Sequence, residues 1–365
     1  MGELMRWLQS LIIFAFCLSA GTASANPILV MDAKSGRVLF GSEANAPWYP
    51  ASLTKMMTAY VTFKAIRDGR VRLDDRISNS QRAAAMPASQ VGLPLDATLP
   101  LETALRILIV KSANDVAVMI AEHVSGSVEN FAVEMNRAAD ALDMRRTNFV
   151  NPNGLPNMNQ YTTALDMAKL ARAIIHEFPQ YNEIFGMQAI KLGRRNLRSH
   201  NSLLRSFEGA DGMKTGFICA SGYNVVASAS RDGRRLIAVV LGASSGGERE
   251  KIASEYLELG FQNAWTNPLV VNLQQASVLQ ASTDVTAVGG TSAPVLQRPT
   301  HMGPVVCRRR YPSSRDPNDI DRWAQDMANL AANVQLPTLR PGPAPRGVAV
   351  TDTNQVPLPV FRPAS

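Results

Sequence analysis

The alternation of strand-like and helix-like sequence is the feature that most restricts the fold of this chain. Short apolar runs joined by turn residues predict a β-hairpin over residues 28–41, and two β-rich runs around Asp232-Gly233 predict another over residues 224–242. Most of the sequence between these hairpins has helical periodicity instead. Strands at both ends with helices between them predict an α+β architecture in one unit of about 240 residues.

Several helices are expected between the hairpins. The first begins near Ser52, where apolar residues recur at three- and four-residue spacing and form one apolar face. A largely helical stretch over residues 101–142 is interrupted at Lys111-Ser112. Two more helices are predicted over residues 161–178 and 248–265.

The composition of the chain changes after Asn267. Thirteen of the 22 prolines lie in the last 99 residues, which contain no Lys and no Glu. We therefore predict a folded domain over residues 26–266 and a largely disordered tail over residues 267–365. A short helix over residues 319–335 has apolar side chains on one face, and it either docks on a partner or forms transiently.

The first 25 residues have the pattern of an export signal. Residues 8–20 are mostly apolar and follow Arg6, and Ala23-Ser24-Ala25 forms a small-x-small cleavage site. An uncleaved membrane anchor is the alternative, although a span needs about 18 apolar residues and fewer are present. We expect an exported protein of the periplasm or cell envelope, cleaved after Ala25.

Cysteine and histidine usage restricts the kinds of site that are possible. After the leader only Cys219 and Cys307 remain, so we expect no disulfide framework and interpret Cys219 as a small buried apolar residue. The histidines are far apart and lack H-x-x-x-H or H-x-H spacing, which argues against a metallopeptidase and predicts no metal and no cofactor. We expect each histidine to be a surface or capping residue: His123, His176, His200 and His301.

The formal net charge of +7 favours weak, salt-screened attraction to anionic envelope surfaces. The sequence contains no zinc-finger spacing, aromatic RNA-binding signature or dense basic helix. Nucleic acid is therefore not an expected partner.

Three short motifs carry the chemistry. They are Ser52-Leu53-Thr54-Lys55, Ser112-Ala113-Asn114 and Lys214-Thr215-Gly216. The first and third patterns each occur once. The S-x-N pattern also occurs in the leader and only 15 residues before Lys214, so spacing selects Ser112, which lies 60 residues after Ser52 and 102 before Lys214.

The first motif can supply an activated nucleophile. A serine hydroxyl is a weak nucleophile unless a base removes its proton. On a helix that starts at Ser52, the Lys55 side chain lies at i+3 and within reach. Lys55 can act as that base only if burial or a second cation, for which Lys214 is the candidate, lowers its pKa. The alternative is a helix-capping serine beside a solvated lysine.

The second and third motifs can complete a site for acyl transfer. Ser112 can relay a proton to a leaving amine, and Asn114 can bond a substrate amide; an ordinary helix N-cap is the alternative for this pair. Lys214 and Thr215 are expected on an edge strand, where an extended acyl substrate binds by strand addition. Gly216 leaves room for that approach.

The ordered motifs resemble the penicillin-binding-protein and serine β-lactamase superfamily. Longer stretches resemble the low-molecular-mass D-alanyl-D-alanine carboxypeptidases, with similarity over about residues 27–266. Those stretches are Tyr49–Met56, Asn151–Leu155 and Asp211–Phe217. The resemblance implies a β-lactamase/transpeptidase-like fold, in which an antiparallel sheet packs against a mostly helical region with the active site between them.

The resemblance also implies a substrate and residue roles. The substrate would be peptidoglycan stem peptides ending in D-Ala-D-Ala, with β-lactams as covalent inhibitors that leave slowly. Ser52 would be the acyl-ester nucleophile and Lys55 its base, and the backbone N–H groups of Ser52 and Phe217 would form the oxyanion hole. Thr215 and Arg249 would bind the terminal carboxylate, unless Arg249 is a solvated charge. Many relatives carry a further β-rich domain and a basic amphipathic anchor, and neither is recognisable in this sequence. Whether the protein attaches to the membrane is therefore left open.

Three other functions are compatible with parts of this pattern. An endopeptidase acting on peptidoglycan cross-links would use the same residues. A class A-type β-lactamase needs a Glu that activates water, and the corresponding residues 148–153 contain no acidic residue. A non-catalytic peptidoglycan-binding protein would have no use for the intact set of Ser52, Lys55, Ser112 and Lys214.

Overall fold

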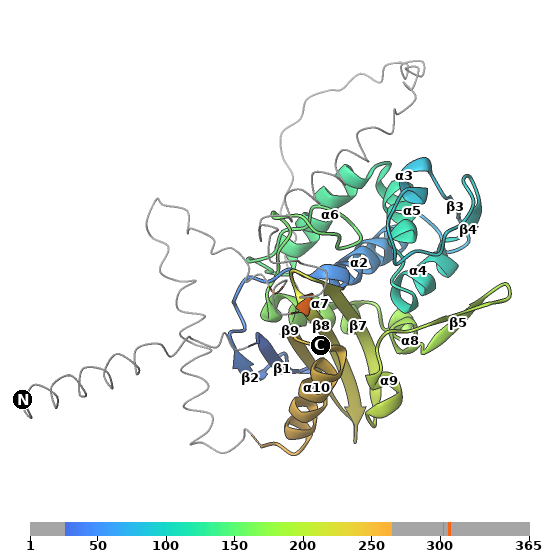
Figure 1. The fold of residues 1–365 in the computed structure, drawn as a ribbon. Coiled ribbons are helices and arrows are strands. Elements are labelled where there is room, and N and C mark those ends of the chain that lie inside the picture. Colours follow the sequence, from blue (N-terminus) through green and yellow to red (C-terminus); the bar gives the residue numbers. More distant parts are fainter. Residues whose placement is uncertain (1–25, 265–301, 303–305, 308–365) are drawn as a thin grey trace, which may run out of the picture.

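The computed structural model describes residues 26–264 together with Met302, Val306 and Cys307, so the predicted leader, the tail and its short helix lie outside the described residues. Five strands form one antiparallel sheet in the order β2-β1-β9-β8-β7 (Figure 1). These strands are β1 (Ile28–Asp32), β2 (Val38–Ser42), β7 (Ala210–Ile218), β8 (Gly222–Arg231) and β9 (Arg234–Ala243). Both predicted hairpins are confirmed, and both belong to the same sheet.

Helices occupy most of the sequence between the two groups of strands, which confirms the α+β prediction. They are the 3₁₀ turn η2 (Ala51–Leu53), α2 (Thr54–Arg67), α3 (Gln81–Ala84), α4 (Leu101–Val110), α5 (Asn114–Ser125), α6 (Val128–Ala141), α7 (Ala164–Glu177), η3 (Pro179–Tyr181), α8 (Asn182–Gly186), α9 (Leu203–Ser206) and α10 (Gly246–Phe261). Two small sheets pair β3 (Arg76–Ser78) with β4 (Thr98–Pro100) and β5 (Ala189–Leu192) with β6 (Arg195–Arg198). No helix among the described residues is both long and apolar enough to cross a membrane.

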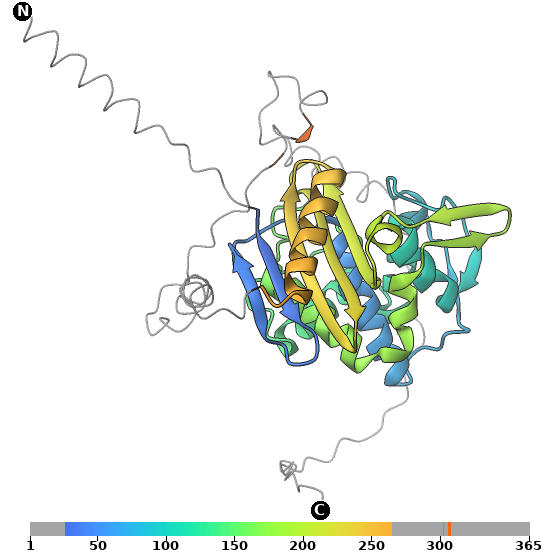
Figure 2. The ribbon, with the colours of Figure 1, turned by 90° about the horizontal axis from the view of Figure 1, so that it is seen from below.

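The large sheet has apolar cores on both faces. Figure 2 shows α10 lying across one face, with most of the other helices behind the sheet; Leu203 of α9 packs on the α10 side. Side chains alternate along a strand, so Val225 and Ala227 of β8 pack with Leu257 of α10, whereas Val226 between them faces the larger helical core. Because both faces are covered, the central strands read as continuous apolar runs rather than as alternating ones.

Helix α2 is buried more completely than its sequence predicted. One apolar face was expected, but every residue from Thr54 to Phe63 is buried. Polar side chains on the other face bond internally: Thr58 Oγ1 donates to the Pro152 carbonyl (2.6 Å), and Thr62 Oγ1 to the Thr58 carbonyl (2.7 Å). A helix buried on all sides is a core helix, and α2 therefore carries the motif at its N-terminus into the interior.

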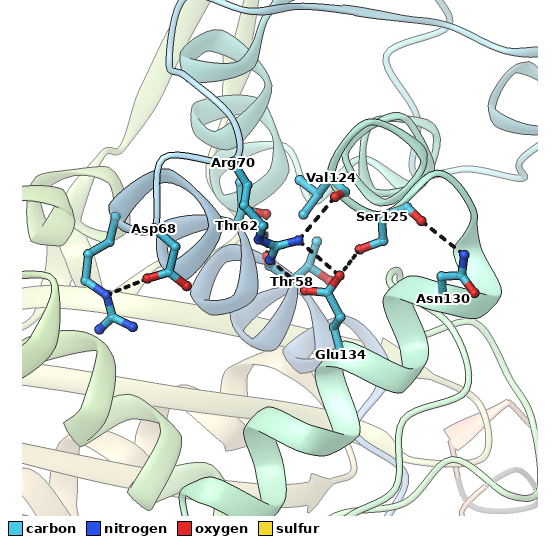
Figure 3. Close-up of polar contacts among 9 residues, drawn as sticks. Thr58, Thr62, Asp68, Arg70, Val124, Ser125, Asn130 and Glu134 are labelled. Atoms are coloured by element: carbon cyan, nitrogen blue, oxygen red, sulfur yellow. Dashed lines mark hydrogen bonds and ion pairs between the residues drawn. The ribbon is translucent and has the colours of Figure 1, made fainter. Parts of the chain in front are cut away.

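The C-terminal end of α2 is tied to α5 and α6 through Arg70 (Figure 3). The guanidinium makes a two-pronged ion pair with Glu134, with Nη2–Oε2 at 2.7 Å and Nη1–Oε1 at 3.2 Å. Ser125 Oγ also donates to Glu134 Oε1 (2.7 Å), and Arg70 Nη1 reaches the Val124 carbonyl at 3.5 Å. These contacts hold the far end of the helix that starts beside Ser52.

The expectation that Cys219 stays unpaired is wrong, because Cys219 and Cys307 form a disulfide with their Cα atoms 5.8 Å apart. Cys219 lies in the turn between β7 and β8, and the Met302 N–H donates to the Ala220 carbonyl in the same turn (2.9 Å). The two cysteines are 88 residues apart, and a single pair forms no spacing pattern from which a disulfide can be predicted. Only the tertiary structure shows that they are close enough to bond.

Candidate active site

A cleft of about 450 Å³ brings the three motifs together between η2, the start of α5 and strand β7. Seven of the predicted site residues line it: Ser52, Ser112, Asn114, Thr215, Gly216, Phe217 and Arg249. The other two, Lys55 and Lys214, are buried directly behind the cleft wall and contact Ser52 and Ser112. Every residue that the motifs selected is thus at one site.

Ser52 sits in η2, immediately before α2, and its position is fixed from the sheet. Asn224 of β8 donates through Nδ2 to the Tyr49 carbonyl (3.0 Å), and its Oδ1 accepts from the Gly242 N–H (2.9 Å). Trp48 Nε1 donates to the Ser221 carbonyl (2.9 Å). The loop that enters η2 is therefore anchored to the sheet just before Ser52.

The Lys55 amine has three oxygen neighbours. Its Nζ lies 3.0 Å from Ser52 Oγ and 2.8 Å from Asn114 Oδ1, and it also contacts the Asn153 carbonyl. Lys55 is completely buried, and this burial, with the charge of Lys214 as a second cause, holds its pKa well below the usual value of 10.5; Asp115 opposes the shift. The solvated-lysine alternative is excluded by this burial.

Lys214 is the second buried amine of the site. Its Nζ donates to Ser112 Oγ and to the Thr215 carbonyl, both at 2.9 Å. Burial, followed by the charge of Arg249, lowers the pKa of Lys214 to about 7. The site thus has two buried amines whose pKa values are lowered, and each bonds one serine of the motifs.

Ser112 and Asn114 do not act as an ordinary helix cap. The N-cap of α5 is Ala113, with no side-chain capping bond. Asn114 instead accepts from Lys55 through Oδ1 and donates through Nδ2 to the Pro87 carbonyl (2.9 Å). Ser112 has a φ of 61°, a left-handed conformation that is unfavourable for a residue with a side chain. Strained positions of this kind cluster at functional sites.

A second strained residue directly precedes the nucleophile motif. Ala51 has a φ of 48°, and Gly154, with a φ of 84°, packs against it. A Cβ atom at Gly154 would lie 1.9 Å from the Ala51 carbonyl oxygen and 2.9 Å from the Ser52 nitrogen. Only glycine fits here, so the Asn151–Leu155 segment sets the backbone position of Ser52.

Replacing Gly154 by Ala is expected to lower the free energy of unfolding by about 3 kcal/mol, because the added methyl overlaps backbone and the positive φ becomes strained. Urea unfolding measures the loss. The matched control is Gly69→Ala, at a φ of 71° with no atom within 4 Å of the added Cβ, which should cost only about 1 kcal/mol. Equal losses in the two variants would contradict the close packing on Ser52.

Strand β7 forms one edge of the large sheet, as predicted, with Gly216 beside Ser52. Among the described residues it pairs with β8 alone, and a Cβ at Gly216 would lie 2.9 Å from the Pro50 carbonyl oxygen and 3.2 Å from the Ser52 nitrogen. The close approach of β7 to η2 thus requires glycine at this position.

Cations gather at one end of the cleft, by the first half of β7. Arg249 is 8% exposed, which excludes the solvated-charge alternative, and burial lowers the pKa of its guanidinium. Its Nη2 donates to the His200 carbonyl (3.4 Å), and among the described residues it forms no ion pair with a carboxylate. Partial desolvation and the charges of Lys214, Lys111 and Arg249 lower the pKa of His200. This end of the cleft is suited to an anionic group.

Sequence reasoning missed several residues of the cleft. The Asn153 carbonyl and Gly154 belong to a stretch that the resemblance singled out, but no role was assigned to them. His200 was expected to be a surface or capping residue, yet it lines the cleft. Its neighbour Asn201 donates to the Gly212 carbonyl (3.0 Å) and so holds the start of β7. Tyr223 stacks on Phe217 with ring centroids 4.3 Å apart.

Among the residues that the structure describes, the cleft lining contains one histidine, His200, and no cysteine or carboxylate that could bind a metal ion with it. In the part of the chain that the structure describes, no group of three or more His, Cys, Asp and Glu side chains is arranged to hold one. No Asp or Glu side chain is among the described residues that line the cleft.

Comparison with known sequences supports the geometry. A model of the D-alanyl-D-alanine carboxypeptidase family matches residues 15–245. The D-alanyl-D-alanine carboxypeptidase DacA of Haemophilus influenzae is 36% identical over 245 residues, which cover 66% of this chain and 62% of that protein. DacF of Bacillus subtilis is 32% identical over 250 residues, which cover 67% of this chain and 64% of that protein. The chain therefore spans less than two thirds of the length of these relatives.

Solved structures with the same fold include penicillin-binding proteins. Penicillin binding protein 5 from Haemophilus influenzae superposes with a TM-score of 0.64 at 34% identity, covering 67% of this chain and 73% of that one. Penicillin-binding protein D2 from Listeria monocytogenes, in its ampicillin-bound form, gives a TM-score of 0.60 at 29% identity, covering 65% and 97%. With a family match over residues 15–245 and this shared fold, the chain belongs to the D-alanyl-D-alanine carboxypeptidase family.

Proposed function

We propose that this protein is a serine-type D-Ala-D-Ala carboxypeptidase, which removes the terminal D-alanine from peptidoglycan stem pentapeptides through an acyl-enzyme on Ser52. The observation that carries the proposal is the environment of the Lys55 amine, which is buried, has a lowered pKa and lies 3.0 Å from the Ser52 hydroxyl. A base beside a serine is what nucleophilic catalysis by serine requires.

The contacts of Lys55 explain how its amine acts as a base. A neutral amine has two N–H donors and one lone pair. Asn114 Oδ1 and the Asn153 carbonyl can only accept, so they take the two N–H groups. The lone pair is then left for the Ser52 proton. Ser52 Oγ attacks the carbonyl between the two D-alanines while Lys55 takes its proton.

Ser112 and Lys214 serve the leaving group. Ser112 Oγ accepts a hydrogen bond from Lys214 Nζ, so its own proton is free to pass to the nitrogen of the departing D-alanine. Lys214 replaces that proton. Water then hydrolyses the acyl-enzyme on Ser52.

The substrate binds along the free edge of β7. An extended peptide adds to this edge as a further strand, with its carbonyl oxygen towards the backbone N–H groups of Ser52 and Phe217. The terminal carboxylate pairs with Arg249 and the Thr215 hydroxyl at the cationic end of the cleft. Arg249 suits this role because it is buried and its guanidinium has donors to spare.

β-Lactams acylate Ser52 in the same way and leave slowly. The Listeria monocytogenes relative has been solved in ampicillin-bound and cefotaxime-bound forms. Here the described lining of the cleft offers no carboxylate to activate a deacylating water, which distinguishes the site from a class A-type β-lactamase. We place the protein in the cell envelope, where its substrate is found; cleavage after Ala25 and the division of the chain at residue 266 stay predictions.

The test is D-alanine release from diacyl-Lys-D-Ala-D-Ala by the purified full chain, with benzylpenicillin labelling in parallel. We expect release of one D-alanine from each peptide and a long-lived penicilloyl adduct. Release only from cross-linked muropeptides would indicate an endopeptidase, rapid multiple turnover of penicillin would indicate a β-lactamase, and neither release nor labelling would favour a binding protein.

A further inference from the structure

The cleft differs in chemistry from one end to the other. His200 lies towards the start of β7, next to the Asn201 that bonds Gly212, and Arg249 donates to the His200 carbonyl; Ser52 lies further along β7, beside Gly216. Towards the end of β7 the described lining includes Phe217, which is 41% exposed, its stacking partner Tyr223, and Ile218. A substrate whose anionic terminus binds at the cationic end must direct its acyl side along β7 towards Ile218.

Ile218 leads into the turn that holds Cys219. Its side chain packs with Tyr49, Met158 and Ala220, and none of these carries a charge. The turn is closed by its own hydrogen bonds, with the Ser221 N–H donating to the Ile218 carbonyl at 3.0 Å. The apolar end of the cleft therefore continues into an apolar surface at the end of the β7–β8 hairpin.

A second segment of the chain is fastened to this turn in two ways. The Met302 N–H donates to the Ala220 carbonyl (2.9 Å), and Cys307 is bonded to Cys219. The Val306 N–H donates to the Met302 carbonyl (3.0 Å), which joins the two attachments. We call Ile218–Ser221, together with Met302, Val306 and Cys307, the disulfide-linked turn.

The reach of an extended substrate places a particular residue at this turn. A strand rises about 3.3 Å per residue, so Ile218 is roughly 10 Å along β7 from Thr215. A peptide whose terminal carboxylate is at Thr215 covers that distance with three residues. Its third residue from the C-terminus therefore lies beside Ile218, and the residues before it lie beside the disulfide.

From this juxtaposition we propose that the disulfide-linked turn is the subsite for the third residue of the stem peptide, the diamino acid, and that it contacts the aliphatic part of that side chain. The proposal rests on the proposed carboxypeptidase function. Cys219 and Cys307 are positioning residues in it, because they hold the wall in place without touching the reacting atoms.

The experiment compares two substrates that differ only in whether they reach the turn. N-acetyl-D-Ala-D-Ala ends before Ile218, and diacyl-Lys-D-Ala-D-Ala extends to it. The readout is the ratio of kcat/KM for the longer to the shorter peptide, measured on the full chain for wild type, Cys307→Ser, the double variant Cys219→Ser/Cys307→Ser, and Ile218→Ala with its disulfide verified by mass.

The ratio is expected to fall about tenfold in all three variants because KM for the longer peptide rises. A tenfold change corresponds to the loss of apolar contact by roughly two methylene groups. Val133→Ser, an exposed change on α6, is the control and should keep the wild-type ratio. Penicillin labelling verifies that each protein is folded; if a cysteine variant does not fold, Ile218→Ala decides alone.

An unchanged ratio would overturn the proposal, whether both values of kcat/KM are kept or both fall by the same factor. An equal fall would mean that the disulfide only steadies the catalytic backbone. These results differ from a failure of the proposed function, in which the wild type would release D-alanine from neither peptide.

Discussion

Ser52→Ala is expected to lower D-alanine release by at least about four orders of magnitude and to abolish covalent labelling by penicillin. Loss of a nucleophile removes the acyl-enzyme pathway entirely, and in serine hydrolases such a change costs up to about 10⁶ in kcat. The free energy of unfolding should change by no more than about 1 kcal/mol, because only the contact between Ser52 and Lys55 is lost. Released D-alanine and the mass of the penicillin-treated protein are the measurements.

The matched control for this variant is Ser78→Ala, on the exposed side of β3, which should behave as wild type. If Ser52→Ala still released D-alanine, the nucleophile would have to be another group. If the urea midpoint of Ser52→Ala were far below that of the wild type, the loss of activity could not be assigned to chemistry.

Lys55→Arg is expected to be nearly as damaging, with penicillin acylation slowed by at least about 10³-fold. Arginine keeps the positive charge but cannot give up its proton, so it cannot take the proton of Ser52. General bases contribute about 10²–10⁴ to rate, and the larger guanidinium also disturbs the contacts with Asn114 and Asn153. Lys64→Arg, later on the same helix, is the control and should acylate normally.

The pH dependence of acylation separates a base from a fixed charge. A base must be neutral, so the acylation rate of the wild type should rise with pH as Lys55 loses its proton and should level off above its pKa. Burial and the charge of Lys214 lower that pKa, so the plateau is expected well below 10.5. Lys214, with a pKa of about 7, loses its proton in the same range, so a fall at higher pH would report the loss of the proton that it supplies to Ser112. A rate that did not rise at all as Lys55 lost its proton would contradict the role of Lys55 as the base.

Much of the site could be read from the sequence because its chemistry is local. A serine and a lysine three residues apart on a helix start are within reach wherever that helix lies, and the structure has them 3.0 Å apart. The hairpin around Asp232-Gly233 was readable for the same reason, since turn residues act on their own neighbours. The bounds of α10 moved from 248–265 to Gly246–Phe261, which is ordinary uncertainty at helix ends.

The features of the site that could not be predicted from the sequence depend on contacts between distant segments. His200 belongs to an S-x-N pattern that was set aside because of its spacing, yet it lines the cleft, next to Asn201, which bonds the start of β7. The strain at Ala51 depends on Gly154, about a hundred residues later. The disulfide was missed because two cysteines in segments of different composition give no spacing signal.

The sequence by itself therefore determined the α+β class, the pairing of Ser52 with Lys55 that we propose as nucleophile and base, and the strand that carries Lys214, because periodicity and short motifs are properties of neighbouring residues. Tertiary structure decided the rest. Burial, rather than any motif, lowers the pKa of Lys55, and packing of the sheet against the helices brings Lys214 to Ser112 across 102 residues. The electrostatic environment of a buried group and the proximity of distant segments arise only when the chain folds and its core excludes water. They therefore cannot be predicted from a short stretch of sequence.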